Sequence, residues 1–360
     1  MKGVFVSDCE GPLSKNDNAY ELTAHFVPDG GKLFSLISKY DDVLADVSKK
    51  KGYNAGDTLK LILPFLKAYD VTDEKIQDFS AKKLLLIAGT KETLNHISSI
   101  APAFIVSTSY EHYIMALCAF VGFPFQNTYC THLCIDKYSL TEREKAKLKA
   151  FTQEIAAMNM ITIPAGAKST KDFCSQDQAT LKRLDQIFWE EIPKMTCAKF
   201  FSEVTTVGGE EKAQAIRDIA KKLQVPLSAV MYVGDSITDV QAFQLVRENL
   251  GLTVSLNGNN YAVKNAEVSV MSENNIITAI LADVFLKHGK GEAMKAIENW
   301  TPEYLKNSSA EPSLLSRLFT LYPKTLPKVQ IVTHANMDSL TRESSEFRKK
   351  VRGQAVARLG

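Results

Sequence analysis

Short strand-like runs alternate with helical stretches along this chain, and this alternation restricts its fold more than any other feature. Four runs are rich in β-branched and aromatic residues and end at small or polar ones: GVFVSD (3–8), AFIVST (103–108), VMYVGD (230–235) and GLTVSL (251–256). Helical stretches lie between them, and EEKAQAIRDIAKKL (210–223) carries its apolar residues at helical spacing. Strands joined through helices pair in parallel, with helices on both faces of the sheet. We therefore predict an α/β fold.

Two long helical segments interrupt this alternation, at residues 14–83 and 137–198. The first contains amphipathic stretches such as GDTLKLILPFLKAYD, and neither segment contains an internal repeat. Beyond Lys287 the strand-like runs stop, and residues 287–360 are predicted to form a helical extension. What remains is a discontinuous sheet core made of residues 1–13, 84–136 and 199–286.

The charge balance gives no sign of a nucleic-acid partner. Lys and Arg total 43 against 41 for Asp and Glu, so the chain has no overall basic footprint. The end of the chain, FRKKVRGQAVAR (347–358), is locally basic, but Glu343 and Glu346 lie at its beginning. We interpret this end as a solvated helix face.

No apolar run is long enough to span a bilayer, and Asp8 interrupts the apolar N-terminal run before a signal-peptide core could form. The chain is therefore predicted to be cytoplasmic, with no membrane partner. Its six cysteines are too dispersed for a disulfide scaffold and suit a reducing compartment.

Polar side chains follow three of the predicted strands. Asp8 comes after the first run, Ser107 after AFIV, and Asp235 after VMYVG. The carboxyl ends of parallel strands share one rim of an open sheet, and this rim is where ligands bind. We therefore expect these residues to lie close together, although more than 100 positions separate some of them.

The motifs around these residues resemble those of the haloacid dehalogenase superfamily of phosphohydrolases, and within it the branch similar to phosphoserine phosphatases. All four motifs occur in order: DCEGPL (8–13), STS (107–109), Lys212 in GGEEKAQAI, and GDSITD (234–239). Residues 251–270 also resemble the strand and loop that follow the fourth motif. The resemblance covers roughly half the chain and implies a Rossmann-like sheet, with residues 14–83 as a helical cap and 137–198 as a second helical insertion.

The resemblance implies that Asp8 is a nucleophile that attacks phosphorus and forms an aspartyl-phosphate. A carboxylate and a phosphate repel each other, and Mg²⁺ would offset this repulsion. The implied metal ligands are the side chains of Asp8 and Asp235 and the backbone carbonyl of Glu10. Asp239 would support the metal or its waters.

Further residues are implied to bind the phosphate. Ser107 would receive it at a strand-to-helix turn, with Thr108 or Ser109 taking this place if the strand ends later. Lys212 would offset the charge shared by Asp8 and the phosphate. Asn257 would either cap a loop or reach the phosphate.

Glu10 occupies the position of the family's general acid and base, where Asp is usual. Glutamate keeps the titratable carboxyl group and lengthens the reach of the side chain by about 1.5 Å.

A second group of potential ligands, Cys130, His132 and Cys134, alternates along TYCTHLCID. An extended strand would project all three to one side, but would space them too widely for one zinc ion. We interpret the group as part of a buried, mixed face.

These features predict a Mg²⁺-dependent phosphatase that hydrolyses a small phosphorylated metabolite. The helical insertions would govern the choice of substrate, and residues 137–198 are longer than the corresponding part of phosphoserine phosphatases, which argues against phosphoserine itself. Two alternatives remain open: an accessory or binding subunit of a larger assembly, and a phosphotransferase that uses the same residues. The insertions would also offer contacts for a homo-oligomer or a protein partner.

Overall fold

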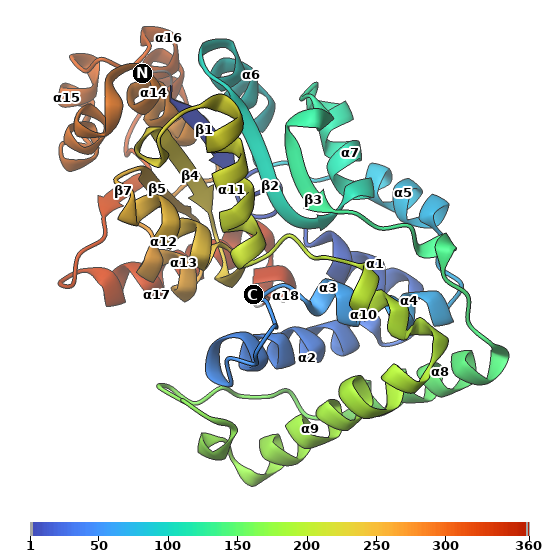
Figure 1. The fold of residues 1–360 in the computed structure, drawn as a ribbon. Helices are drawn as coiled ribbons and strands as arrows, with labels where there is room; N and C mark the ends of the chain where they lie inside the picture. Colours follow the sequence, from blue (N-terminus) through green and yellow to red (C-terminus); the bar gives the residue numbers. More distant parts are fainter. Residues whose placement is uncertain (1–2, 358, 360) are drawn as a thin grey trace.

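A seven-stranded sheet forms the centre of the protein in the computed structural model, which describes residues 3–357 and 359 (Figure 1). Its strand order is β3-β2-β1-β4-β5-β6-β7, and all neighbours pair in parallel except β6 and β7. The strands are β1 (Val4–Ser7), β2 (Ala103–Tyr110), β3 (Thr128–Thr131), β4 (Val230–Gly234), β5 (Leu252–Leu256), β6 (Val268–Met271) and β7 (Lys328–Ile331). The predicted Rossmann-like α/β class is confirmed.

Helices bury both faces of this sheet. Phe5 of β1 belongs to one apolar cluster, whereas its neighbours Val4 and Val6 belong to another on the opposite face. This alternation follows from the two-residue period of a strand, and the burial of both faces explains why the strands are almost wholly apolar. Helices α6 (Thr90–Ile100), α7 (Glu111–Val121) and α14 (Ile276–Glu298) pack on the Phe5 face, and α11 (Glu210–Leu223), α12 (Val240–Glu248) and α13 (Asn260–Asn265) on the other.

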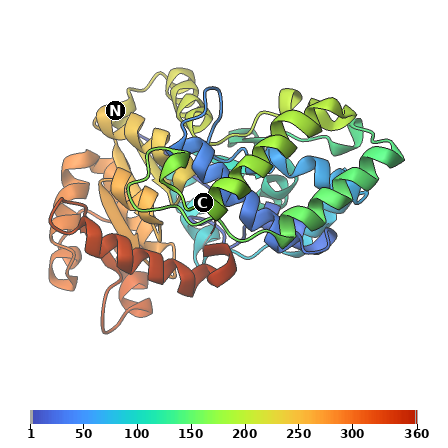
Figure 2. The same ribbon diagram turned by 90° about the horizontal axis from the view of Figure 1, so that it is seen from below.

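The two helical insertions fold together into one lobe beside the sheet (Figures 1 and 2). The first provides α1 (Asn18–Phe26), α2 (Gly30–Asp42), α3 (Thr58–Leu61), α4 (Leu63–Ala68) and α5 (Asp73–Lys82). The second provides α8 (Glu142–Ala157) and α9 (Ser175–Gln186), and α10 (Lys199–Glu203) follows it.

One apolar cluster unites this helical lobe. The ring of Phe188 stacks on Tyr40 with centroids 5.8 Å apart, and it meets the edge of Phe65 at 6.1 Å. Phe188 comes from the second insertion, and its two partners come from the first. The second insertion therefore completes the core of the first, and the two are not separate domains.

The C-terminal segment returns to the sheet. It contains α15 (Pro302–Lys306), α16 (Pro312–Leu321), strand β7, α17 (Met337–Arg352) and α18 (Gln354–Ala357). The prediction that residues 287–360 are only helical is wrong at β7, which pairs antiparallel with β6. Of its four side chains only that of Val329 is buried, so this edge strand lacks the apolar run that marked the others.

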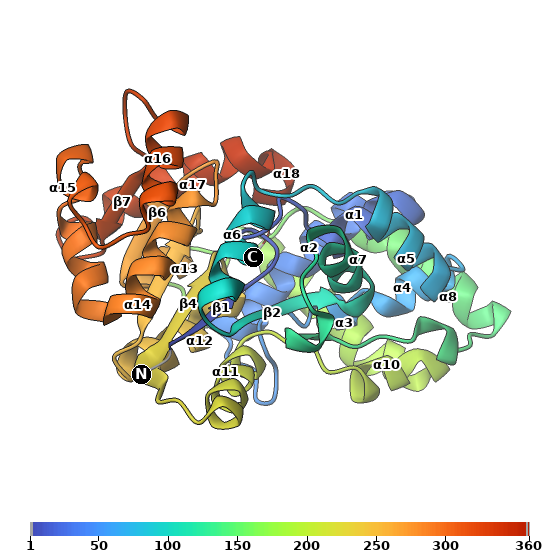
Figure 3. The ribbon, with the colours of Figure 1, turned by 90° about the horizontal axis from the view of Figure 1, so that it is seen from above.

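Helix α17 packs against α13 and β6, as Figures 2 and 3 show. The Ser344 hydroxyl donates a hydrogen bond of 2.6 Å to the carbonyl of Gly258 within this contact. Leu340, one turn earlier, packs with Val263 and Met271. The C-terminal end of α17 is thereby directed toward the carboxyl ends of β1 and β4.

None of the helices in the described part of the chain combines the length and apolarity that crossing a membrane requires.

Candidate active site

Asp8 and Lys212 form a buried ion pair at the carboxyl end of β1. The Lys212 Nζ lies 2.7 Å from Asp8 Oδ2 and 2.8 Å from Asp239 Oδ1. Lys212 is completely buried. It lies in the first turn of α11, far from Asp8 in the sequence. The structure therefore brings together three of the residues that the sequence singled out.

Asp239 shapes the loop that follows β4. Its Oδ2 accepts hydrogen bonds from the backbone N–H groups of Asp235 at 2.8 Å and Ser236 at 2.9 Å. Its Oδ1 accepts a hydrogen bond of 2.6 Å from the Tyr232 hydroxyl in addition to the Lys212 contact. Both carboxylate oxygens thus have protein donors, so Asp239 acts on the site by fixing Asp235 and Lys212.

Burial and charge shift the pKa values of this cluster in opposite directions. Burial raises the pKa of Asp8 to about 7, although the Lys212 charge lowers it. For Asp239, burial also raises the pKa, but Lys212 and the hydrogen bonds outweigh it and the net pKa is lowered. Burial lowers the pKa of Lys212, and the two carboxylates overcome this and raise it above its ordinary value. Lys212 therefore stays charged.

The carboxylates of Asp8 and Asp235 suit a divalent cation, and that of Asp239 lies beside them. One oxygen from each lies within 4.8 Å of the others. Gly11 leaves room beside them, because a Cβ atom at this position, where φ is 103°, would come within 2.0 Å of Asp235 Oδ2. Carboxylate and carbonyl oxygens are the ligands that Mg²⁺ prefers. The donor set thus fits the metal that the sequence predicted.

The residues expected to bind phosphate lie within β2, not after it. This strand continues to Tyr110, with a register shift against β3 between Val106 and Tyr110. The prediction of a strand-to-helix turn at Ser107 is therefore wrong, because the irregular register lets the strand continue through the motif. Ser107 and Thr108 both line the cleft beside Asp8.

Within this motif the hydroxyl groups have different partners. Those of Ser107 and Ser109 lie 3.1 Å apart and share a hydrogen bond. The Thr108 hydroxyl is buried and has no hydrogen-bond partner among the described residues. A buried hydroxyl without a partner beside a cleft is suited to a polar ligand. Ser109 is not among the residues that line the cleft.

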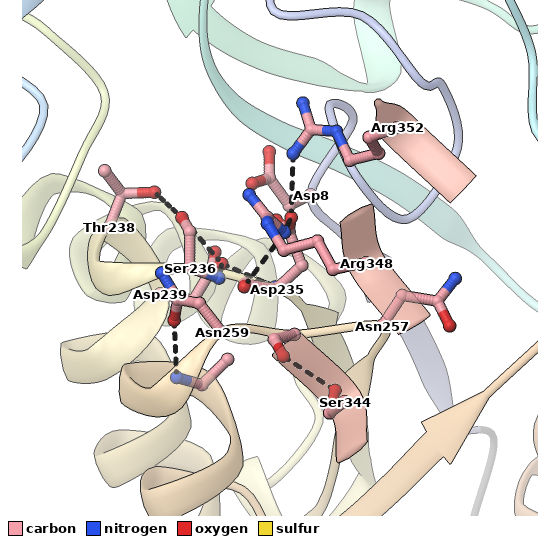
Figure 4. Close-up of polar contacts among 12 residues, drawn as sticks. Asp8, Asp235, Ser236, Thr238, Asp239, Asn257, Asn259, Ser344, Arg348 and Arg352 are labelled. Carbon is pink, nitrogen blue, oxygen red and sulfur yellow. Dashed lines mark hydrogen bonds and ion pairs between the residues drawn. The ribbon is translucent and has the colours of Figure 1, made fainter. Parts of the chain in front are cut away.

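Asn257 does not reach the site. Its side-chain amide donates to the carbonyl of Ser272 at 2.8 Å and accepts from the backbone N–H of Ser272 at 2.9 Å. It points away from Asp8 and Asp235 (Figure 4). Of the two roles that the sequence left open for Asn257, its hydrogen bonds agree with the cap on this loop and not with the contact with phosphate.

Glu10 links the loop after β1 to the helical lobe. Its Oε1 accepts a hydrogen bond of 2.6 Å from the backbone N–H of Asn18, at the start of α1. Burial raises the pKa of Glu10 well above its ordinary value, and Asp17 adds to this effect. A carboxyl group with a raised pKa retains its proton more readily, as a general acid must.

The site lies in a cleft between the sheet and the helical lobe. The sheet side contributes Asp8, Glu10, Ser107, Thr108 and Asp235 through Thr238, and the lobe contributes Asp17, Phe34, Ser38, Asp41, Gly56, Thr58 and Leu59. A Cβ atom at Gly56 would come within 2.9 Å of Thr108 and 3.1 Å of Thr238. The lobe therefore contacts β2 and the loop after β4 directly.

Two arginines of α17 also line this cleft, and they are not among the site residues predicted from the sequence. The guanidinium groups of Arg348 and Arg352 both contact Asp235 Oδ2, the latter at 3.0 Å (Figure 4). Arg348 is only 2% exposed, so the interpretation of the basic end as a solvated face is wrong for these residues. Leu340, Ser344, Arg348 and Arg352 recur every four residues along one side of the helix, and this spacing was the available signal.

Cys130, His132 and Cys134 do not form a site. Only Cys130 is buried, while Cys134 is exposed and His132 pairs with Glu111 at 2.9 Å. The interpretation of a buried mixed face is wrong for two of the three, because β3 ends at Thr131 and the chain turns away. The only metal-like cluster among the described residues is that of Asp8, Asp235 and Asp239.

A family model of haloacid dehalogenase-like hydrolases matches residues 67–283, which is more than half of the chain. The protein therefore belongs to this family of hydrolases. The matched range includes Ser107, Lys212, Asp235 and Asp239 and begins after Asp8 and Glu10.

Three solved structures are similar to this chain, and the first of them supports the fold. A gene product of Archaeoglobus fulgidus is 23% identical, with a TM-score of 0.81 over 100% of this chain and 99% of that one. Phosphoserine phosphatase in its apo form is 14% identical, with a TM-score of 0.43 over 81% of this chain and 100% of that one. A phospho-aspartyl intermediate analogue of phosphoserine phosphatase is also 14% identical, with a TM-score of 0.46 over 78% and 98%. A search of curated proteins finds no match.

Proposed function

We propose that this hydrolase is a Mg²⁺-dependent phosphatase that cleaves a small phosphate monoester through an aspartyl-phosphate on Asp8. The observation that carries the proposal is the contact of Lys212 Nζ with Asp8 and Asp239, within a cluster of three carboxylates at the end of β1. This arrangement combines a carboxylate nucleophile, a fixed positive charge and a set of oxygen ligands for a metal ion.

The metal ion would be held by the side chains of Asp8 and Asp235 and the backbone carbonyl of Glu10. When bound, it would supply positive charge that lets the anionic phosphate approach the carboxylate. Asp239 keeps Asp235 in place through its hydrogen bond to the Asp235 backbone N–H.

In the first step an oxygen of Asp8 forms a bond to phosphorus while the bond between phosphorus and the leaving oxygen breaks. Lys212 offsets the negative charge that collects around Asp8 and the phosphoryl group. The hydroxyl of Thr108, which lacks a partner in the described structure, donates to a phosphoryl oxygen, and Ser107 lies beside it. Glu10 gives its proton to the leaving oxygen.

In the second step water attacks the aspartyl-phosphate and releases inorganic phosphate. Glu10, now deprotonated, takes a proton from this water. The hydrogen bond from the Asn18 N–H holds the carboxyl group of Glu10 at the edge of the cleft for both steps. The helical lobe covers the cleft and restricts the substrate to a small molecule.

Hydrolysis of p-nitrophenyl phosphate tests this function. The wild-type protein should release p-nitrophenol with Mg²⁺ and stop when EDTA is added. Asp8→Asn removes the nucleophile while keeping its size, and the rate should fall by roughly a thousandfold or more. A rate that Asp8→Asn leaves unchanged, or no hydrolysis of this or a panel of small phosphate monoesters, would contradict the proposal.

A further inference from the structure

We infer that Arg348 and Arg352 recognise a second anionic group on the substrate, so that the preferred substrate is a phosphate monoester whose leaving group carries a carboxylate or another phosphate. The inference rests on the proposed function for the position of the phosphoryl group. It assigns a role to α17, which lies outside the residues matched by the family model.

The two guanidinium groups are held inside the cleft by hydrogen bonds and ion pairs. Arg348 donates through Nη1 to the backbone carbonyl of Asp235 at 3.3 Å as well as to its carboxylate. Arg352 donates through Nε to the carbonyl of Lys15 at 3.2 Å and through Nη2 to the carbonyl of Asn16. Their side chains are 2% and 4% exposed. Such buried, preorganised guanidinium groups suit the recognition of carboxylates and phosphates.

The arginines lie on the side of Asp8 opposite the phosphate-binding hydroxyls. Strand β1 stands between β2 and β4 in the sheet. Ser107 and Thr108 belong to β2, whereas both arginines contact Asp235, which follows β4. The two groups of donors therefore flank the nucleophile and are placed to bind different parts of one ligand.

Arg352 also lies on the side of the cleft where the leaving group is expected. It binds the carbonyls of Lys15 and Asn16, and Glu10 binds the N–H of Asn18 in the same short segment. Glu10 is the proposed acid for the leaving oxygen. An anionic group attached to this oxygen would therefore lie within the part of the cleft that Arg352 lines.

The arginines carry more positive charge than their protein partners neutralise by direct contact. Asp235 is the one carboxylate that either guanidinium contacts in the part of the chain described here, and both use the same oxygen. In addition, the buried Arg348 Nε has no hydrogen-bond partner among the described residues. Two buried guanidinium groups that share one carboxylate oxygen, and a buried donor without a partner, are costly, and an anionic ligand satisfies both.

A matched pair of probes tests the inference. Phosphoglycolate and ethyl phosphate differ mainly in the carboxylate, and ethylene glycol bisphosphate extends the test to a second phosphate. Their binding is measured calorimetrically with Mg²⁺ in the Asp8→Asn background, which prevents turnover. A charge-assisted contact should favour phosphoglycolate over ethyl phosphate by about tenfold or more.

Removing the charge of the arginine should abolish this preference. With Arg352→Gln added, the affinities for phosphoglycolate and ethyl phosphate should agree within about twofold, and Arg348→Gln should act in the same direction. Arg352→Lys keeps the charge without the planar fork and should retain part of the preference, which covers the case of a poorly folded glutamine variant. Lys349→Gln is the matched control, because Lys349 is on the same helix and pairs with Glu346 at the surface.

Three results would overturn the inference. Equal affinity of the Asp8→Asn protein for all three probes would show that no second anion is recognised. Equal weakening of every probe in the arginine variants would place the guanidinium groups on the phosphoryl group itself. Tighter binding of every probe in these variants would make α17 an obstacle in the cleft. Binding does not need turnover, so discrimination without hydrolysis would refute the proposed phosphatase and leave the second-anion site standing.

Discussion

Glu10 shows how one side chain can depart from a family pattern for a structural reason. Its carboxyl group reaches the N–H of Asn18 at 2.6 Å, and this bond joins the loop after β1 to the first helix of the lobe. Aspartate, the usual residue, is shorter by one methylene, and this contact accounts for the extra length. The longer side chain thus ties the proposed acid to the element that covers the cleft.

Several site residues could be predicted because their residue types suit the chemistry and their positions along the chain place them at one edge of the sheet. Asp8, Lys212 and Asp235 stand at the ends of strands or at the start of a helix, and parallel topology brings these ends together. Arg348 could not be predicted in this way, because the four-residue spacing along its helix marks a packed face but does not identify Asp235, 113 positions away, as its partner. Asn257 was ambiguous for a similar reason, since its partner Ser272 lies on another loop.

Asp41 should make stability depend on pH. Burial raises the pKa of this carboxyl group to about 8, from 3.8 in the unfolded chain. Between about pH 4 and pH 8 the folded state therefore binds more protons than the unfolded state, and the free energy of unfolding falls as the pH rises. The contribution of protonated Asp41 to the free energy of unfolding is fully present below about pH 4 and is lost by about pH 8.

Asp41→Asn removes this titration while keeping an oxygen that can accept from the N–H of Gly56, as Asp41 does at 2.9 Å. Urea unfolding at several pH values should show that wild-type stability falls relative to the variant between pH 4 and pH 8, by about 1.4 kcal/mol for each unit of pKa shift. If the stability of the two proteins changed with pH in the same way, the raised pKa of Asp41 would be refuted.

At the scale of elements, the loop between α2 and α3 closes the helical lobe onto the sheet. Gly56 has a φ of 97° and leaves no space for a Cβ atom between itself and the methyl groups of Thr108 and Thr238. Gly208 makes a comparable approach, because a Cβ atom there would lie 2.2 Å from the carbonyl of Ala55. Two glycines thus allow the lobe and the active-site loops to meet.

Gly56→Ala should therefore weaken closure and lower kcat/KM for small phosphate monoesters by roughly tenfold or more. Gly52→Ala is the matched control, since Gly52 also has a positive φ, of 74°, but nothing lies within 4 Å of its Cβ position. Both variants carry the backbone strain of a positive φ, and only the first adds the contact. Equal kcat/KM values for the two variants would show that this contact does not control the cleft.

Element prediction succeeded where burial was high and failed at the edge of the sheet. The central strands are apolar on both faces and were recognisable from the sequence. Strand β7 has one buried side chain. Its pairing with β6 is fixed by tertiary contacts that cannot be predicted from its four residues. Helix α17 was expected as a helix, but the face that it buries is set by α13 and β6.

At the scale of the whole molecule, the sheet supplies the proposed chemistry, while the helical lobe and α17 line the cleft beside it. The sequence predicted the sheet core and the two insertions. It could not show that the insertions share one core, because the contact of Phe188 with Tyr40 and Phe65 joins segments more than 100 residues apart. It also gave no role to the C-terminal extension, although α17 enters the site.

The central claim is that Asp8 becomes phosphorylated during turnover, and chemical trapping tests it most directly. The protein is mixed with Mg²⁺ and p-nitrophenyl phosphate, quenched rapidly and treated with borohydride, which reduces an aspartyl-phosphate to homoserine. Mass spectrometry of the N-terminal peptide should then find homoserine at position 8 in the wild-type protein, and none in Asp8→Asn or without substrate. Turnover that leaves Asp8 unchanged, or homoserine at another carboxylate, would contradict the account.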